Sequence, residues 1–478
     1  MKTIYSIFSH ELSTKKRNAS LISMFAIMQL LLVIALFTGW HQYQRASEFQ
    51  TTTQQLVEQQ WQQQPDRHPH RVAHFGHYTF RPPSALSFFD IGVNNFLGNS
   101  IFIEAHRQNS ANFANDFDAS SLLRFSELSV ANILLLIWPL LLIAFAFNTI
   151  SGEQQGGTLR QLLSLGVSYR QLFLGKSLGY LLLSLCFLAP VFIASILLVN
   201  LSGITFDADV LQRLSIMALV YLFYCLFWII AILLVSSVIK QPRHVLALLI
   251  SLWFVLTILM PRVVADYAAT SHPLMKRNDL QLAVKLETKK VGDSHNPDDP
   301  YFNAFKAKIL AEYNVKSIEE LPINYRGLVM KEGEKITAEI YQKLYQTEFT
   351  KLTKQQAIIA RFYWLNPYMF SRDISMALSR SDAWHFYDYE QQSETHRYQR
   401  TQKLNDIHVN HIELAHDRAQ KADQSLWKQF NEFTYQQPTL AWSLKPFSFI
   451  WLVPLVIIAL LTWVVLSVFV RTRVYENA

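Results

Sequence analysis

One stretch of the chain contains the residue types of a phosphate-binding loop. Residues 150–176 read ISGEQQGGTLRQLLSLGVSYRQLFLGK, with a glycine pair and a Gly-Lys ending. Such a loop needs the pattern G-x-x-x-x-G-K-[ST], because its backbone amides surround the phosphate and its lysine reaches it. Gly175, Lys176 and Ser177 are present, but Arg170 occupies the position of the first glycine. We therefore predict no nucleotide site here, and a Lys176 side chain that extends from a membrane helix toward water.

Histidines form the second group that could carry chemistry. Four lie within ten residues of an irregular segment, and three more lie on a predicted helix: His68, His70, His74 and His77, then His408, His411 and His416. Imidazoles at such spacings can bind zinc or copper. No cysteine accompanies them, however, and His416 follows His411 by five positions, which is poor spacing for one ligand set. We expect surface or hydrogen-bonded histidines and no bound metal, with the first four as the alternative ligand set.

Catalytic motifs are missing from the segments that we expect to be exported. These segments contain many Ser, His and Asp residues, but neither a nucleophile elbow nor the pattern H-E-x-x-H. We therefore predict no catalytic residue in this chain and no enzyme activity of its own.

The elements that must position these residues are membrane helices. Of 478 residues, 51% are hydrophobic, which is high for a soluble protein and low for one that lies wholly in the membrane. Six apolar runs approach or exceed the roughly 18 residues that cross a hydrocarbon core of about 30 Å. They predict spans at 20–40, 129–150, 172–200, 213–239, 245–262 and 446–470, the fifth ending at Pro261-Arg262.

The distribution of Lys and Arg predicts the orientation of these spans. Basic residues gather in the segments 1–19, 151–171, 240–244 and 471–478, whereas the short linker 201–212 has two aspartates and no base near its centre. Because cytoplasmic loops are enriched in Lys and Arg, both termini should face the cytoplasm. Residues 41–128 and 263–445 are then exported. The net charge of +7 is explained by this bias, so we expect no nucleic-acid partner.

The two long exported segments differ in their patterns. The first opens with a glutamine-rich stretch that should continue the first membrane helix outward, followed by the short β-prone pieces HYTF and SIFIEA. The second has apolar residues at helical spacing and should be mainly helical, with a last long helix from about Trp384 to Glu432. The predicted fold class is an α-helical integral membrane protein with a large helical exported domain and a smaller irregular, β-containing one.

The stretch 150–176 also resembles the cytoplasmic loop between the second and third membrane helices of type-2 ABC transporter permeases. The resemblance is carried by an acid, a glycine pair, Thr-Leu, a leucine-rich turn and a Gly-Lys at the next helix: Glu153, Gly157, Thr158, Leu159, Leu162, Leu163, Gly175 and Lys176. Six spans and the charged N-terminal segment HELSTKKRNAS fit the same family. The exported segments resemble a bacterial subfamily often labelled as permeases for multicopper-enzyme maturation, a label whose activity these residues do not demonstrate.

The resemblance implies that the loop is a coupling helix that docks on a separate ATPase subunit, which binds the ATP and magnesium. The implied coupling residues are Glu153, Gly156, Gly157, Thr158, Leu159, Arg160, Leu162 and Leu163. We expect a short helix that begins near Gly156-Gly157, with Thr158 as its N-cap and with Leu159, Leu162, Leu163 and Leu165 as apolar contacts for the partner. The alternative is an amphipathic interfacial helix without a partner.

These observations predict a permease subunit of an exporter in a bacterial inner membrane, surrounded by lipids and paired with itself or a similar permease. The cores of the six apolar runs contain no Asp, Glu, Arg or His, so we expect ATP and not an ion gradient to supply the energy. Two alternatives stay open. ATP-driven motion could pass to an exported domain that acts on an envelope partner, or the chain could be a membrane-anchored sensor or scaffold without an ATPase.

Overall fold

The computed structural model describes residues 2–109, 129–202, 207–292, 296, 298–447 and 452–476. Helices dominate this part of the chain, and its strands form one two-stranded sheet. The predicted class, an α-helical membrane protein with a largely helical additional region, is confirmed. Parts of the predicted first exported segment, short exported linker, sixth span and C-terminal tail lie outside the described residues.

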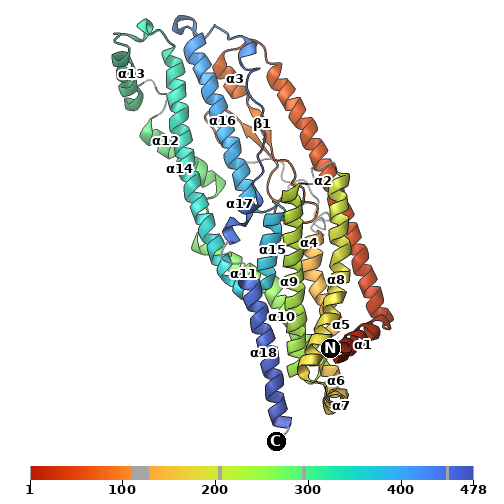
Figure 1. Cartoon of the computed structure of the whole chain (residues 1–478). Coiled ribbons are helices and arrows are strands. Elements are labelled where there is room, and N and C mark those ends of the chain that lie inside the picture. The colour runs from red at the N-terminus through yellow and green to blue at the C-terminus, as the bar shows by residue number, and fades with distance from the viewer. Residues whose placement is uncertain are drawn as a thin grey trace.

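Five helical stretches among the described residues are long and apolar enough to cross a membrane. They are α2 (Ala19–Gln62), the series α4 to α6 (Val130–Gln155), α8 (Tyr169–Leu201), α9 (Ala208–Val238) and the series α10 to α11 (Pro242–Ser271). A sixth span results if Leu440–Phe447 and Leu452–Val464, which are bent by 50° relative to each other, are taken together. Helix α1 (Lys2–Lys16), the short helix α7 (Thr158–Ser164) and the end of α18 (Leu452–Glu476) lie at the same end of the molecule (Figure 1).

Two of the spans contain a π-helical turn whose carbonyls receive hydrogen bonds from side chains. The first π turn is η3 (Ile133–Ile137), which lies between α4 (Val130–Asn132) and α5 (Trp138–Ala146). The Tyr224 hydroxyl donates to Leu135 O and the Trp253 indole N–H donates to Leu136 O, both at 2.9 Å. In η4 (Val255–Leu259), Asn366 donates to Leu256 O at 2.8 Å. These bonds satisfy carbonyls that the irregular turn releases, and they tie each turn to a neighbouring element.

The helix of the predicted fifth span continues beyond Pro261. After α10 (Pro242–Phe254) and η4, helix α11 (Met260–Ser271) continues without a break. Pro261 occupies one of the first two positions of α11, directly after the π turn, where its missing amide hydrogen disturbs the helix least. The helix therefore extends about two further turns toward the exported domain.

The segment predicted to be the first exported element begins with the second half of α2, whose 44 residues span about 66 Å at 1.5 Å per residue. The prediction that the glutamine-rich stretch continues the membrane helix is confirmed. Helix α3 (Pro69–Phe75) and the strands β1 (His77–Phe80) and β2 (Ser100–Ile103) follow. The strands are antiparallel, with His77 opposite Ile103, and they are the two pieces that the sequence marks as β-prone.

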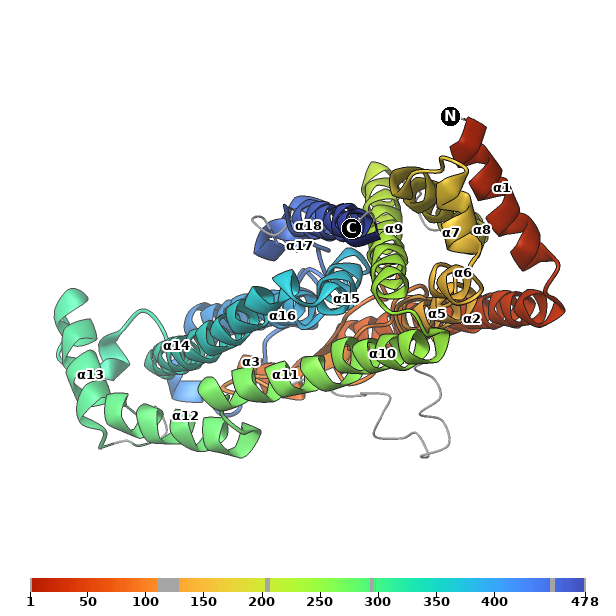
Figure 2. The ribbon, with the colours of Figure 1, turned by 90° about the horizontal axis from the view of Figure 1, so that it is seen from below.

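The segment predicted to be the second exported element is built on two long antiparallel helices, α14 (Tyr325–Arg361) and α16 (Ala383–His411). The remaining helices are α12 (Arg277–Val291), α13 (Pro300–Glu312) and α15 (Pro367–Leu378), with short 3-10 turns at Ile318–Glu320 and Phe362–Trp364. Helices α12 and α13 lie to one side of the membrane helices, away from α1 and α2, in both views (Figures 1 and 2).

The helix predicted from Trp384 to Glu432 ends at His411, so its second half was wrong. After Ile412 the chain contains only the 3-10 turns Leu414–His416 and Gln424–Leu426 before α17 (Leu440–Leu444) and the turn Lys445–Phe447. Ala422 pairs with Arg67 in an isolated β-bridge, and Trp427 is buried beside Trp61 in a separate cluster. Packing against the first exported element therefore overrides the helical pattern of this segment.

Candidate functional site

The predicted coupling loop meets helix α1 where α1 crosses the first turns of α8. A Cβ atom on Gly175 would lie 2.7 Å from Ile7 Cγ2 and 3.0 Å from Ile4 O, and one on Gly179 would lie 3.5 Å from Glu11 Cβ. Small residues four apart let two helix backbones approach closely, as they do in many membrane helix pairs. The Gly-Lys that resembled a phosphate loop is therefore a helix-packing site. Residues 175–179 (GKSLG) also match the G-x-S-x-G pattern of a nucleophile elbow. They lie within α8 and not at a strand-to-helix turn, so they do not form one.

Lys176 is the centre of a buried charge network, which we call the cytoplasmic joint: Glu11, Thr149, Glu153, Lys176 and Tyr180. Its ammonium group lies 2.9 Å from Glu11 Oε2, 2.8 Å from Glu153 Oε1 and 2.9 Å from Thr149 O. The residue is only 2% exposed, so the prediction that its side chain extends toward water was wrong. Two carboxylates from separate elements hold it inside, because a buried ammonium needs paired charge.

Glu11 joins α1 to this network through several donors. Its Oε1 accepts hydrogen bonds from Tyr180 and from Thr149, the latter at 3.2 Å, and lies 3.6 Å from Lys15 Nζ. Burial raises the pKa of Glu11, but the charges of Lys176 and Lys15 outweigh it and leave this pKa below its ordinary value. The carboxyl group is therefore ionised at neutral pH, as an ion pair with Lys176 requires.

The loop itself consists of two short helices, α6 (Ser151–Gln155) and α7, separated by Gly156 and Gly157. Gly157 adopts φ +77°, in the left-handed region that favours glycine, and it occupies the N-cap position of α7. The predicted start of the helix is confirmed. Thr158 as the N-cap was wrong, because it is the first helical residue and its hydroxyl donates to Glu153 O at 3.4 Å.

The four leucines predicted to face a partner point in different directions. Leu159 is 6% exposed and belongs to the main hydrophobic core, and Leu162 and Leu163 pack partly against that core. Leu165, at the end of α7, is 80% exposed. The exposed residues of α7 and its C-cap are therefore Thr158, Arg160, Gln161, Ser164 and Leu165, while Leu159 holds the loop to the membrane helices.

Helix α6 is bonded directly to the end of α9. Ser236 Oγ accepts hydrogen bonds from the amides of Ile150 and Ser151 at 3.1 and 3.0 Å, and Gln154 donates to Ser237 O at 2.9 Å. Together with Lys176, these bonds attach the loop to α1, α8 and α9 at once. The sequence reading missed Glu11 and Ser236 as members of the site. The single acidic residue in the basic segment HELSTKK was the one available signal.

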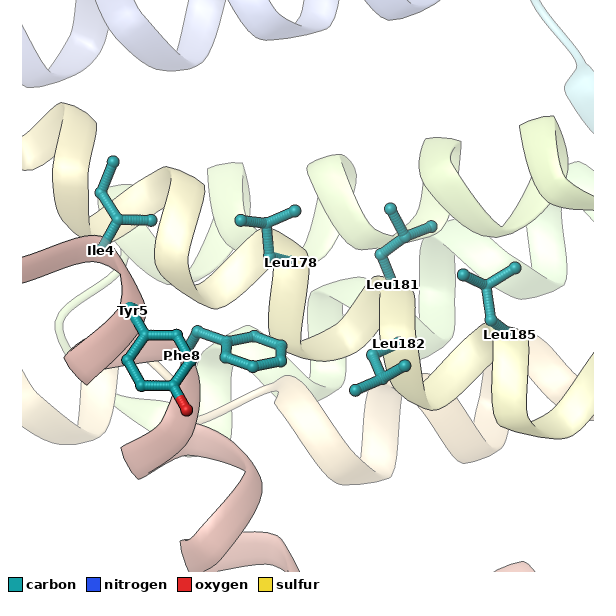
Figure 3. Close-up of a pocket in the computed structure, with 7 residues that line it drawn as sticks. All are labelled: Ile4, Tyr5, Phe8, Leu178, Leu181, Leu182 and Leu185. Atoms are coloured by element: carbon teal, nitrogen blue, oxygen red, sulfur yellow. The ribbon is translucent and has the colours of Figure 1, made fainter. Parts of the chain in front are cut away.

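An apolar groove lies beside the joint, between α1 and α8 (Figure 3). Side chains of both helices line it: Ile4, Tyr5, Phe8, Leu178, Leu181, Leu182 and Leu185. No charged side chain is among them. Such a surface at the edge of a membrane helix suits lipid acyl chains.

The four histidines of the alternative metal set do not converge. His68 contacts His408 and Asp417, whereas His70 and His74 lie with His106, and His77 is buried between Trp61 and Glu58. Of the second set, only His408 is buried, and His411 and His416 are exposed.

The fold defines a multi-pass helical membrane protein, and comparison with known families supports a permease component of a transporter. Residues 101–259 match the model of ABC-2 family transporter proteins, and residues 279–436 match a domain of unknown function, DUF3526. This combination is consistent with a type-2 ABC permease that carries an extra domain. The ABC-2 family supplies the membrane component of a transporter and implies an ABC ATPase as partner. No curated protein matches the chain.

Proposed function

We propose that this chain is the transmembrane subunit of an ATP-driven type-2 ABC exporter, coupled through α6 and α7 to a separate ATPase that holds the ATP and magnesium. The observation that carries the proposal is the loop itself, whose outer face is exposed while its inner face is bonded to three helices. The loop falls inside the region that matches ABC-2 transporters. Both termini would then face the cytoplasm of a bacterium, and a second permease copy would complete the path.

The arrangement suits the transfer of force from a closing ATPase. A push on α7 reaches α8 and α1 through Lys176 and reaches α9 through Ser236. Helix α9 has 31 residues and is about 46 Å long, enough to cross the membrane as one rod. The proposed mechanism is therefore a rigid-body movement of these helices, in which this chain contributes no chemical step.

A second candidate function follows from the opposite end of α9. Arg213 and Arg380 both bind Asp209, at 2.6 and 2.8 Å, and both donate to Pro438 O. Arg213 also donates to Ala377 O and Leu378 O at the end of α15. Motion of α9 would thus reach the DUF3526 region directly. This connection favours an assembly that delivers ATP-driven motion to an exported domain and its envelope partner, without cargo.

The coupling proposal is tested by Leu165→Asp, which changes an exposed side chain and should leave folding intact. We expect the purified variant to lose the ATPase subunit encoded by a neighbouring gene when both are co-expressed. Leu282→Asp, at an exposed leucine of α12, is the matched control and should keep it. Equal recovery of ATPase with both variants, or no ATPase with the unaltered chain, would contradict the proposal and favour the scaffold.

Transport and mechanical work are separated by the complex in lipid vesicles. Accumulation of a hydrophobic cargo that depends on ATP would support export. ATP hydrolysis that is stimulated by an envelope extract but moves no cargo would overturn export in favour of the second candidate.

A further inference from the structure

Three histidines from two separate elements come together on the exported side of the molecule. His70 and His74 lie one turn apart on α3, and His106 lies in the turn after β2. One ring nitrogen from each lies within 4.8 Å of the others, and the ring centroids are 4.7 to 5.8 Å apart. The three histidines come together only because β1 pairs with β2. Their spacing in the sequence therefore gave no reason to group His106 with His70 and His74.

His106 is oriented by a buried carboxylate. Its Nδ1 lies 3.1 Å from Glu334 Oε2, which also accepts the backbone amide of His106 at 2.8 Å. Glu334 is fully buried and is itself held by Arg397 at 2.6 Å. Metal-binding histidines usually donate their second ring nitrogen to a carboxylate in this way, because the bond fixes the tautomer and directs the other nitrogen to the ion.

The backbone at His106 is held in an unusual conformation. Its φ of +61° is in the left-handed region, which is uncommon and strained for a residue with a side chain. The neighbouring residue Ala105 donates its amide to Ala73 O at 3.3 Å, which ties this turn to α3. The two elements that carry the histidines are therefore fixed to each other without any ion.

His70 supplies the clearest sign of a ligand. Its Nδ1 is buried, and the described part of the chain offers it no hydrogen-bond partner. A buried polar atom left without a partner destabilises the folded protein, and a bound cation would remove that penalty. A tetrahedral ion with metal–nitrogen bonds of about 2.0–2.1 Å requires the ligand nitrogens to lie roughly 3.3 Å apart. His74 is exposed, so its ring can rotate to bring its nitrogen closer to the other two.

The neighbouring histidine cluster also holds buried ring nitrogens without a hydrogen-bond partner among the described residues, His68 Nε2 and His408 Nδ1, but its carboxylate is already occupied. Asp417 already accepts hydrogen bonds from His408 at 2.7 Å and Asn324 at 2.8 Å on one oxygen, and from Arg326 at 3.2 Å on the other. Its oxygens are occupied by a network that joins the start of α14 to the end of α16. We assign a structural role to that cluster and do not extend the metal argument to it.

We propose that His70, His74 and His106 bind one divalent transition-metal ion of the kind that prefers imidazole, Zn²⁺ or Cu²⁺, on the exported side. Mg²⁺ and Ca²⁺ prefer oxygen ligands and do not fit this set. Three protein ligands leave a fourth position of a tetrahedral ion for water or an external ligand. The exposed His74 places that position at the surface of the exported region.

The test uses the full-length protein in detergent, purified without a polyhistidine tag and stripped with a chelator. Equilibrium dialysis against Zn²⁺, read by elemental analysis, should give one ion per chain bound more tightly than the rest. His74→Ala should weaken this binding at least tenfold, and Glu334→Gln should weaken it about 10- to 100-fold through the orientation of His106. Co²⁺ should show the visible absorption of a tetrahedral site that His74→Ala abolishes.

His416→Ala is the matched control, since His416 is an exposed histidine of the same exported region outside the cluster. This variant should bind Zn²⁺ like the unaltered chain. The proposal is overturned if the unaltered chain binds no ion tightly, or if His74→Ala binds as many ions with the same affinity. Because His74 is exposed, a misfolded variant is not expected, and the α-helical circular dichroism of each variant verifies this.

Discussion

A buried charge network lies near each end of α9, and the two networks are built in different ways. At the cytoplasmic joint, one ammonium group, that of Lys176, lies between carboxylates of α1 and α6. At the other end, which we call the exported joint, the guanidinium of Arg213 binds Asp209 one turn before it and several backbone carbonyls of the exported region. The first network joins mostly side chains to side chains, whereas the second joins arginine side chains mainly to backbone carbonyls.

This difference has a mechanical consequence. An ammonium is a compact charge that can keep its partners through small shifts of a flexible side chain, whereas a guanidinium presents donors in a rigid planar fork. The exported joint therefore fixes α9 to the end of α15, and the cytoplasmic joint allows the loop to adjust against α1 and α8.

The largest expected effect comes from Lys176→Met, which leaves Glu11 and Glu153 buried without their cation. Removing one partner of a buried ion pair costs about 3–5 kcal/mol, so the free energy of unfolding in detergent should fall by roughly that amount. A double-mutant cycle with Glu11→Gln should recover part of the loss, because one of the unpaired charges is then absent. Additive losses in the cycle would contradict the ion pair.

A somewhat smaller effect is expected at the exported joint from Arg213→Lys, although charge is conserved. Lysine cannot reach Asp209 and the carbonyls of Ala377 and Pro438 together, and each hydrogen bond to a charged group contributes about 1.5–3 kcal/mol. We expect a loss of roughly 2–4 kcal/mol in the free energy of unfolding. An unaffected Arg213→Lys variant would show that charge alone matters there, and the contrast between the joints would fail.

The elements of both joints could be predicted from the sequence, but their partners could not. Apolar runs located the spans, and local β propensity located HYTF and SIFI, because these signals depend on neighbours in the chain. The burial of Lys176 depends on Glu11, which is 165 residues away in sequence. The end of α16 at His411 depends on the packing of Trp427 against Trp61, and the separate directions of Leu159 and Leu165 depend on where α7 begins.

Gly175→Ala tests the helix crossing that brings Glu11 to Lys176. The added Cβ would meet Ile7 at 2.7 Å and Ile4 O at 3.0 Å, so α1 must shift, and the expected cost is about 1–3 kcal/mol in the free energy of unfolding. Gly152→Ala is the matched control, because its Cβ would meet only Asn148 Cβ at 3.6 Å. Equal effects of the two substitutions would refute a close approach at Gly175.

The smallest expected effect is a pH dependence confined to the cytoplasmic joint. The folded pKa of Glu11 lies below its ordinary value of 4.5, mainly because the charges of Lys176 and Lys15 outweigh burial. The folded state thus favours the ionised group, so its stabilisation is complete above pH 4.5 and is lost as the pH falls through the folded pKa. The difference in unfolding free energy between the unaltered chain and Glu11→Gln should therefore shrink below pH 4.5.

The control for this pH dependence is Glu312→Gln, at an exposed glutamate of α13, which should leave the pH profile of stability unchanged. Thermal unfolding in detergent across pH 3 to 7 measures both differences. A gap between the unaltered chain and Glu11→Gln that stays constant through acid pH would mean that Glu11 is neutral in the folded protein. The cytoplasmic joint would then hold Lys176 through Glu153 alone, and α1 would be packed beside the loop without being electrostatically attached to it.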